Sequence, residues 1–296
     1  MECRRGRRRP EEGLGAMQGK VVVITGATSG IGQIAAGRLA EMGARLVLVA
    51  RDRERADATL ARLETLNPRA GHRAHFADLS RLAEMKRVAA EIAKAEPRVD
   101  VLINNAGAMF ARRQVTDDGL ELTFALNHMA YFVLTEGLRR RLAAAAPARV
   151  INTASAAHRR FALDFDDLQS ERGYRGFEVY GRSKLCNILF ASALARRAAG
   201  EGISAYALHP GFVATRFGDA SGGLVAVAIR LAKRFALTPE AGAATLVHLA
   251  SAPDVGGASG GYFHECKPAT PSAAAQDDTA AERLWAESER LAGLGN

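Results

Sequence analysis

The sequence predicts an α/β protein built on a single doubly wound parallel sheet of about seven strands, with helices on both faces. Short β-branched runs alternate with helical patterns from Lys20 onward, which is the rhythm of a parallel sheet. The runs are continuously apolar, as parallel strands buried on both faces are. No linker, repeat or break in composition follows Met17, so one sheet accounts for the chain.

Each strand is expected where an apolar run ends in a turn signal, and each helix where apolar residues recur at helical spacing. The expected strands are Val21–Ile24, Arg45–Val49, Arg73–Phe76, Val99–Ile103, Arg149–Asn152 and Ile203–Leu208, with a weaker seventh at Gly261–His264. The expected helices are Ile31–Met42, Arg53–Leu66, Leu82–Ala95, Leu120–Ala145, Val179–Ala199 and Pro239–Ala250.

Two segments depart from this alternation. His158–Phe177 is a polar insertion, and Asp219–Leu237 is a glycine-led helical excursion with one apolar face. Both follow strand ends, where doubly wound sheets bind ligands, so both are candidate substrate walls. Surface decoration is the alternative for the first segment. A lid or a membrane-surface contact is favoured for the second.

The chain is basic without a dominant basic block. Its net charge is +8 over 296 residues, with 48% hydrophobic and 24% charged residues, an ordinary globular balance. Residues 1–16 hold five arginines against three glutamates, a net +2, and the remaining +6 is spread over the rest. We expect residues 1–16 to be a disordered basic tail and residues 17–296 to form one domain. The tail leaves nucleic-acid binding open, but a diffusely basic domain equally suits an anionic cofactor, and we expect no nucleic-acid partner.

The sequence does not indicate a membrane span, a secretion signal or a metal site. The residues before Met17 lack the apolar core of a secretory signal, and no apolar run is long enough to cross a bilayer. Cys3, Cys186 and Cys266 show neither metal-ligand spacing nor a disulfide framework, and Cys186 lies in an apolar helical pattern as a small buried hydrophobe. These features favour a cytoplasmic protein.

The most informative motif is Thr25-Gly26-Ala27-Thr28-Ser29-Gly30-Ile31-Gly32, where the first strand turns into the first helix. Glycines let the backbone turn sharply and approach a ligand, and a helix N-terminus presents N–H groups to a phosphate. The spacing is Gly-x-x-x-Gly-x-Gly, which differs from the Gly-x-Gly-x-x-Gly of the commonest dinucleotide fingerprint. A glycine turn that only packs a helix on a sheet is the alternative.

Tyr180 and Lys184 are one turn apart at the start of a helical pattern, so the phenol and the ammonium group point the same way. A nearby cation lowers the pKa of a phenol from its usual value of about 10. The pair is therefore suited to general acid/base catalysis of exchange between a hydroxyl and a carbonyl. The same spacing also arises by chance on ordinary helix surfaces.

Three further polar features lie near the expected strand ends. Ser155 follows a strand and could donate to a substrate oxygen, or could satisfy its own turn. Asn104-Asn105-Ala106-Gly107 ends another strand and places amide groups at the same edge, unless it is only a tight turn. Asn127 lies among apolar helical residues, so it is either a satisfied core residue or part of a relay.

Taken together, these motifs resemble the short-chain dehydrogenase/reductase family, whose fold is the Rossmann fold. The resemblance implies that Tyr180 is the acid/base, that Lys184 lowers its pKa and holds the nicotinamide ribose, and that Ser155 polarises the substrate oxygen. It also implies that Asn127 supports a water-mediated proton relay behind Lys184. The matching pieces run in the family's order: Thr25–Gly32, Asp78-Leu79, Asn104–Gly107, Asn127, Ser155, Tyr180 with Lys184, and His209–Thr215.

The same resemblance implies the cofactor contacts. Asp78 would address the adenine, Asn105 the adenosine side, and residues 210–215 the nicotinamide amide. The full expected cofactor-binding set is Gly26, Thr28, Ser29, Gly30, Ile31, Gly32, Arg51, Asp78, Leu79, Asn105, Ala106, Gly107, Tyr180, Lys184, Pro210, Gly211, Val213 and Thr215.

The end of the second strand bears on the cofactor subtype. Folds that use NAD place an acid there to bind the ribose 2′-hydroxyl, but this strand ends in Ala50 and Arg51. A guanidinium fork suits a 2′-phosphate, so we expect NADP(H) in preference to NAD(H). Asp52 and the absence of a basic residue at Ser29 weigh against this expectation, and Arg51 could also be an ordinary solvated arginine.

Further details resemble the retinol-dehydrogenase-like branch of the family. They are Leu126-Asn127-His128, the serine–alanine–His158 run, the long insertion before Tyr180, and the stretches at 164–168, 262–267 and 284–289. Membrane-bound members of that branch carry an N-terminal hydrophobic anchor, which we do not expect here. We expect an oxidoreductase that transfers hydride between NADP(H) and a lipophilic carbonyl compound or alcohol. The sequence is compatible with a homo-oligomer as well as with a monomer. The alternative is a catalytically silent NADP-binding sensor or interaction protein.

Overall fold

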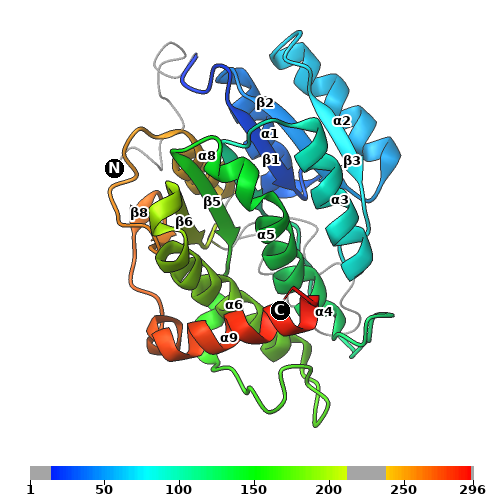
Figure 1. The fold of residues 1–296 in the computed structure, drawn as a ribbon, viewed down its shortest axis with the longest axis vertical. Helices are drawn as coiled ribbons and strands as arrows, with labels where there is room; N and C mark the ends of the chain where they lie inside the picture. The colour runs from blue at the N-terminus through cyan, green and yellow to red at the C-terminus, as the bar shows by residue number, and fades with distance from the viewer. Residues whose placement is uncertain (1–14, 212–237, 295–296) are drawn as a thin grey trace.

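A single sheet of eight strands forms the centre of the protein in the computed structural model, which describes residues 15–211 and 238–294 (Figure 1). The strands lie in the order β3-β2-β1-β4-β5-β6-β7-β8, all parallel except β8, which is antiparallel to β7. The predicted fold class is confirmed, and β8 is an addition. The strands are β1 (Val21–Thr25), β2 (Arg45–Ala50), β3 (Arg73–Phe76), β4 (Val101–Asn104), β5 (Ala148–Thr153), β6 (Ile203–Leu208), β7 (Tyr262–His264) and β8 (Lys267–Pro268).

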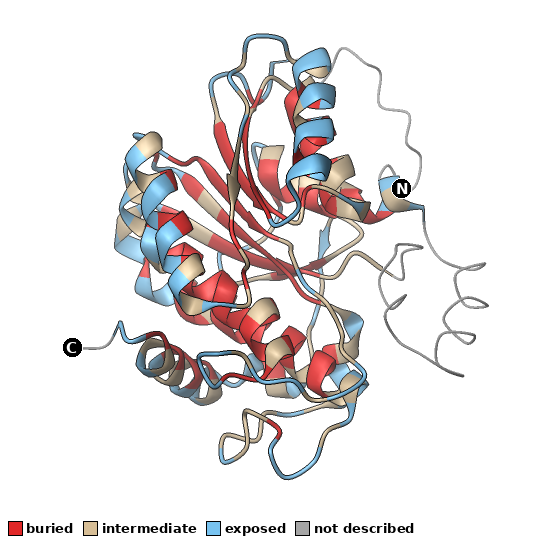
Figure 2. Ribbon diagram, turned by 90° about the vertical axis from the view of Figure 1, so that its right-hand side faces the viewer, coloured by how far each residue is buried: buried red, intermediate tan, exposed pale blue. Residues whose placement is uncertain are grey.

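Helices cover both faces because successive strand residues point to opposite sides (Figure 2). Val22 and Ile24 pack toward α1, α2 and α8, whereas Val21 and Val23 pack toward α3, α5 and α6. The last helix, α9, lies against the outer side of α6. The bounds are α1 (Gly30–Glu41), α2 (Arg53–Leu66), α3 (Leu82–Ala95), α4 (Leu122–Phe124), α5 (Ala130–Ala143), α6 (Gly176–Arg197), α8 (Pro239–Ser251) and α9 (Asp278–Ala292).

The segment expected as one helix, Leu120–Ala145, is interrupted. A π-helical turn, Ala125–Met129, separates α4 from α5 and contains Asn127. Such turns are rare and are frequently found at functional sites. The prediction of a continuous helix is therefore wrong at this point. The sequence pattern did not reveal the interruption, because a π-turn leaves the apolar pattern on either side of it intact.

The two unusual segments and the tail have different outcomes. After the short 3-10 helix Ala156–Arg160, the insertion carries neither helix nor strand up to Arg175, as its polar composition predicts. The excursion Asp219–Leu237 and almost all of the basic tail lie outside the described residues. Helix α9 was not among the expected helices.

The cysteines correct one expectation. Cys186 is free and buried, as its apolar helical setting predicts. Cys266 is disulfide-bonded, so the expectation of no disulfide is wrong for this residue, because sequence spacing carries no signal for such a pair. The cytoplasmic location, which rested partly on the cysteines, stays a prediction.

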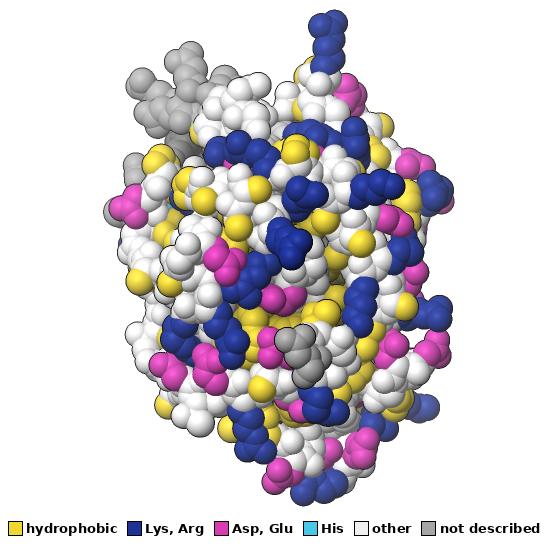
Figure 3. Space-filling view, viewed as in Figure 1, with side chains coloured by type: hydrophobic (Ala, Val, Ile, Leu, Met, Phe, Trp, Pro, Cys, Tyr) yellow, Lys and Arg dark blue, Asp and Glu magenta, His cyan; other side chains and the backbone are white. Residues whose placement is uncertain are grey.

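Charged side chains of both signs are interspersed on the face shown in Figure 3. Many arginines there and elsewhere are paired, for example Arg45 with the buried Glu96 at 2.7 Å and Arg139 with Glu201 at 2.8 Å. Within the described ranges, no helix is long and apolar enough to cross a membrane, and no group of three or more His, Cys, Asp or Glu side chains could hold a metal ion.

Candidate active site

The glycine-rich turn leads from β1 into α1 at the point where the strand order reverses. Gly26 and Gly30 have φ values of +69° and +56°, a region that favours glycine. Ser29 begins the helix with an extended backbone and makes no side-chain capping bond. The first N–H groups of α1 and the positive end of its dipole are thus available to an anion.

Two of these glycines are required by close contacts. A Cβ at Gly32 would lie 2.3 Å from the Gly26 carbonyl oxygen and 2.5 Å from Asn105 Nδ2. A Cβ at Gly26 would lie 2.9 Å from Ala106 Cα. The space along the turn is therefore reserved for backbone, as a close-binding phosphate site requires.

Asn105 ties the end of β4 to this turn. Its Nδ2 donates to the carbonyl oxygens of Thr25 (3.2 Å) and Gly26 (3.3 Å), and its backbone N–H donates to Thr25 Oγ1 at 2.9 Å. The Ala106 N–H donates to the same hydroxyl at 2.9 Å. Two loops that line the crevice at the carboxyl ends of β1 and β4 are thus fixed to each other. Thr25 had no role in the sequence analysis, although it opens the motif.

Tyr180 and Lys184 lie on the same face of α6, as their spacing predicts. Lys184 Nζ donates to the Thr153 carbonyl oxygen at 2.9 Å and lies 5.7 Å from the centre of the Tyr180 ring. Gly107 lies beside them, since a Cβ there would be 3.3 Å from Lys184 Nζ. The end of β5, the loop after β4 and the start of α6 therefore converge on the lysine.

The pKa values of this pair depart from the sequence expectation. Burial raises the pKa of Tyr180 to about 12, against a smaller lowering by its hydrogen bond with the Ser155 side chain. Burial also lowers the pKa of Lys184 to about 7. The expected lowering of the phenol pKa by Lys184 is therefore not found, because desolvation pushes both groups toward their neutral forms.

Ser155 and Asn127 complete the set. Ser155 follows β5, and its Oγ both accepts from the Ala157 N–H at 3.2 Å and interacts with Tyr180. Asn127 is fully buried; its Oδ1 accepts from the Ala108 N–H at 2.8 Å, and its Nδ2 donates to Ser183 Oγ at 2.9 Å. The first alternative for Asn127 is confirmed, because its amide is satisfied in the core, whereas its part in a relay stays a prediction. Asn127 lies beside the loop after β4, since a Cβ at Gly107 would be 3.0 Å from Asn127 Oδ1.

The part of the crevice beyond the ends of β2 and β3 carries opposite charges. Asp78 Oδ1 accepts from the N–H and the hydroxyl of Ser80, at 3.0 and 2.7 Å. Burial acts to raise the Asp78 pKa, but these bonds and the charge of Arg51 lower it overall. Arg51 is exposed and makes no hydrogen bond or ion pair with the described residues, whereas Arg53 lies over the Phe76 ring at 4.0 Å. Leu79 is buried beside Asp78.

The loop after β6 begins in the same crevice. The Gly211 N–H donates to His209 Nδ1 at 2.9 Å, and Gly211 has a φ of +83°. The His209 ring stacks on that of His264 at 4.0 Å. The expected contacts Val213 and Thr215 lie outside the described residues.

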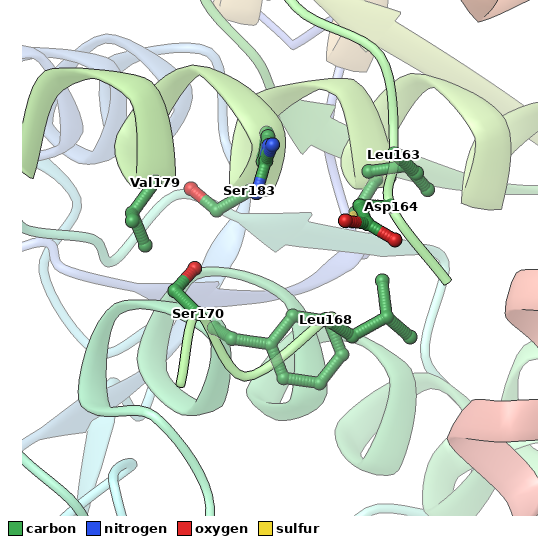
Figure 4. Close-up of a pocket in the computed structure, with 9 residues that line it drawn as sticks. Leu163, Asp164, Leu168, Ser170, Val179 and Ser183 are labelled. Atoms are coloured by element: carbon green, nitrogen blue, oxygen red, sulfur yellow. The ribbon is translucent and has the colours of Figure 1, made fainter. Parts of the chain in front are cut away.

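A separate small cavity of about 10 Å³, roughly the space of one water molecule, lies on another side of α6 (Figure 4). The hydroxyl groups of Ser170 and Ser183 point into it from opposite sides, and Ser183 links it to Asn127. Tyr180, Lys184 and Ser155 do not line it, so it is not the reacting site. Its lining is Phe124, Leu163, Asp164, Leu168, Ser170, Val179, Arg182, Ser183 and Cys186.

Comparison with known proteins agrees with this geometry. Residues 20–222 match the family model described as short chain dehydrogenase. The chain belongs to the short-chain dehydrogenase family. Its members are oxidoreductases that use a nicotinamide cofactor and transfer hydride, and this chain falls in the retinol-dehydrogenase-like branch.

Relatives in this family match most of the chain. It is 41% identical to human retinol dehydrogenase 13, over 93% of this chain and 85% of that protein. It is also 41% identical to human retinol dehydrogenase 12, over 94% and 88%. Among solved structures, an uncharacterised protein from Mycobacterium paratuberculosis matches with a TM-score of 0.75 and 31% identity, over 95% and 96% of the two chains. The Pseudomonas aeruginosa RhlG/NADP complex matches with a TM-score of 0.63 and 30% identity, over 80% and 91%.

Proposed function

We propose that this family member transfers hydride between NADP(H) and the carbonyl or alcohol group of a lipophilic small molecule, with Tyr180 as general acid/base. The observation that carries the proposal is the convergence of Tyr180, Ser155 and Lys184 at the end of β5. A phenol with a raised pKa keeps its proton at neutral pH. It can therefore donate that proton to a carbonyl oxygen.

The roles of the chain's own groups follow from their positions. Ser155 Oγ, beside the phenol, donates to the substrate oxygen as negative charge develops on it. Lys184 is held by the Thr153 carbonyl where it can donate to a ribose hydroxyl, and Asn127 holds the loop at Ala108 beside it. The bound nicotinamide cofactor supplies or accepts the hydride.

The crevice fits such a cofactor on its own geometry. The uncapped start of α1 and the space kept open by Gly26 and Gly32 suit a pyrophosphate. We assign Asp78 to the adenine side and the backbone around Asn105 to the adenosine. We keep the whole expected set as cofactor contacts: Gly26, Thr28, Ser29, Gly30, Ile31, Gly32, Arg51, Asp78, Leu79, Asn105, Ala106, Gly107, Tyr180, Lys184, Pro210, Gly211, Val213 and Thr215.

Two features support an apolar substrate. The Phe161 ring lies against α6 at Gly181, next to Tyr180, where a Cβ would be 2.3 Å from the ring. Phe177, which is 49% exposed, packs on Phe161 with ring centres 6.0 Å apart. The relatives named retinol dehydrogenases point to the same substrate class.

The test is NADPH oxidation against a panel of aliphatic and aromatic aldehydes and ketones. We expect Tyr180→Phe to lose turnover by about 100-fold or more while NADPH binding, followed by fluorescence, changes less than about threefold. Tyr206→Phe is the matched control, because it removes a buried phenol oxygen on the opposite face of the sheet. A fully active Tyr180→Phe would overturn the mechanism. A wild-type chain that binds NADPH but turns over no carbonyl compound would favour a non-catalytic binding protein.

The NADP(H) preference rests on Arg51. Loss of a charge-assisted contact to the 2′-phosphate should raise the KM for NADPH about 10- to 100-fold in Arg51→Ala, with the KM for NADH changed less than about twofold. Arg53→Ala is the control, since Arg53 is engaged with Phe76. Equal losses for both cofactors in Arg51→Ala would refute a 2′-phosphate contact.

A further inference from the structure

A buried histidine ties the end of β5 to a segment that follows the last strand. His158 lies in the short 3-10 helix Ala156–Arg160 and is 0% exposed. Its Nδ1 lies 2.6 Å from the carbonyl oxygen of Ser155, and its Nε2 accepts from the Ser272 N–H at 3.2 Å. The side chain therefore bridges the residue that starts this helix and a residue 114 positions further along the chain.

The two partners of the ring define where its proton lies. A backbone N–H can only donate, so Nε2 of His158 carries no proton. The proton of the neutral ring is then on Nδ1, which donates it to the Ser155 carbonyl oxygen. Burial holds the pKa of His158 below its ordinary value, so the ring is neutral at pH 7. The bridge thus exists in one tautomer, which donates at one end and accepts at the other.

The 3-10 helix holds Ser155 by both its backbone and its side chain. The Ser155 carbonyl oxygen also accepts from the His158 N–H at 3.2 Å, and the Ser155 Oγ accepts from the Ala157 N–H at 3.2 Å. On the other side, the Ala154 N–H donates to the Leu208 carbonyl oxygen at 2.7 Å, so the sheet fixes the residue before Ser155. The position of the Ser155 hydroxyl therefore depends on this helix, and the His158 side chain supplies a buried contact that holds the helix in place.

The segment that contacts His158 is itself part of the packed fold. Ser272 precedes the 3-10 helix Ala273–Gln276, which contributes to the core beside α6. The Tyr262 ring of β7 meets the His158 ring edge-on, with the ring centres 5.2 Å apart. Two separate sequence signals, the serine–alanine–His158 run and the stretch 262–267, thus lie against each other in the structure.

We propose that His158 is a positioning residue for Ser155: in its Nδ1–H tautomer it holds the Ser155 carbonyl and so sets where the Ser155 hydroxyl meets the substrate oxygen. This inference rests on the proposed function for its kinetic consequences. His158 acts through Ser155 and takes no part in proton transfer, because backbone groups occupy both of its ring nitrogens.

Amide side chains test the two ring contacts separately. In His158→Asn the amide nitrogen lies where Nδ1 lay and can still donate to the Ser155 carbonyl, whereas the longer side chain of His158→Gln reaches toward Ser272. We expect His158→Leu to lower kcat about 5- to 30-fold, His158→Gln to be nearly as poor, and His158→Asn to stay within about threefold of the wild type. The KM for NADPH should change less than about twofold in all three variants, since Ser155 is assigned to the substrate oxygen.

A double-variant cycle separates positioning from general loosening. Ser155→Ala removes the donor, so adding His158→Leu to it should lower kcat by less than about twofold more. Arg159→Met is the matched control: it removes a neighbouring tie from the same 3-10 helix, the 2.5 Å bond to the Thr270 carbonyl oxygen, and should leave kcat within about twofold of the wild type.

Three kinetic results would overturn the proposal. They are losses that multiply in the double variant, a loss in Arg159→Met equal to that in His158→Leu, and a His158→Asn variant as poor as His158→Leu. If Ser155→Ala leaves no measurable turnover, the comparison of the three His158 variants decides on its own.

One pair of readouts does not need turnover. NMR of the histidine ring nitrogens at pH 7 should show His158 with a protonated Nδ1 and an unprotonated Nε2. The Ala157 amide, bonded to Ser155 Oγ, should exchange its hydrogen faster in His158→Leu than in His158→Asn. An inactive wild-type chain with both results intact would count against the proposed function alone. A ring protonated at Nε2, or equal exchange in the two variants, would refute the positioning role.

Discussion

The two titratable residues of the site, Lys184 and Tyr180, are buried, and burial destabilises the charged form of each. Lys184 is 3% exposed and Tyr180 9% exposed. A buried ammonium group with one carbonyl acceptor is poorly solvated, which is why its pKa falls to about 7. We therefore expect the lysine to lower the stability of the protein without bound cofactor.

Lys184→Met should raise the melting temperature at pH 7 by roughly 3 °C, the shift that about 2 kcal/mol produces in a chain of this size. The unfolded lysine keeps its proton up to about pH 10.5 and the folded one up to about pH 7. Between these values the unfolded chain binds more protons, so the free energy of unfolding of the wild type rises with pH. The advantage of the variant should thus shrink from pH 7 to pH 10 in calorimetry. A variant that melts below the wild type at pH 7 would contradict this account.

At the scale of elements, the site consists of helix starts and strand ends held together by short contacts. The start of α1 meets the loop after β4 so closely that the glycines between them have no free volume. The two elements therefore form one rigid wall of the crevice, and a small change at their contact should affect both stability and cofactor binding.

Gly32→Ala should destabilise the fold by about 1–3 kcal/mol and weaken NADPH binding, because its methyl group would displace the Gly26 carbonyl and Asn105. Gly37→Ala, in the same helix, is the control. Its Cβ would lie an ordinary 3.5 Å from Leu66 Cδ1, so helix propensity should make it neutral or stabilising by about 0.5–1 kcal/mol. Urea unfolding and NADPH titration measure both variants. Equal effects at the two positions would refute the steric argument.

The sequence predicted the regular strands and helices better than the π-turn and the long-range side-chain contacts. The seven parallel strands and the placement of Tyr180, Lys184 and Ser155 followed from periodicity and motif order, because these depend on local pattern. The π-turn at Asn127 could not be predicted, since one inserted residue leaves the apolar spacing unchanged on each side. The bond between His128 and Ser288 depends on a tertiary contact across 160 positions, for which one sequence carries no signal.

At the scale of the whole molecule, two apolar cores lie on opposite faces of the one sheet. Helix α9 belongs to the core on the α3, α5 and α6 face through Leu284 and Trp285. Since this helix shares a core with the sheet, we propose that it folds and unfolds with the rest of the domain.

Trp285 is the only tryptophan of the chain, so its fluorescence reports the docking of α9. In a urea titration its emission should shift to the red in the same transition as the loss of far-UV circular dichroism, as in a two-state domain. The two midpoints should agree within about 0.2 M. A fluorescence transition at clearly lower urea would show that α9 undocks as a separate unit.

The short strand β8 affects whether the sheet edges of two protein molecules can pair with each other. It is the edge of the sheet on that side, and it consists of Lys267 and Pro268. Proline has no backbone N–H to offer, and a charged lysine is costly to bury against another chain. Strand β8 therefore disfavours the addition of a strand from another molecule at this edge. We expect this to reduce edge-to-edge aggregation at high protein concentration.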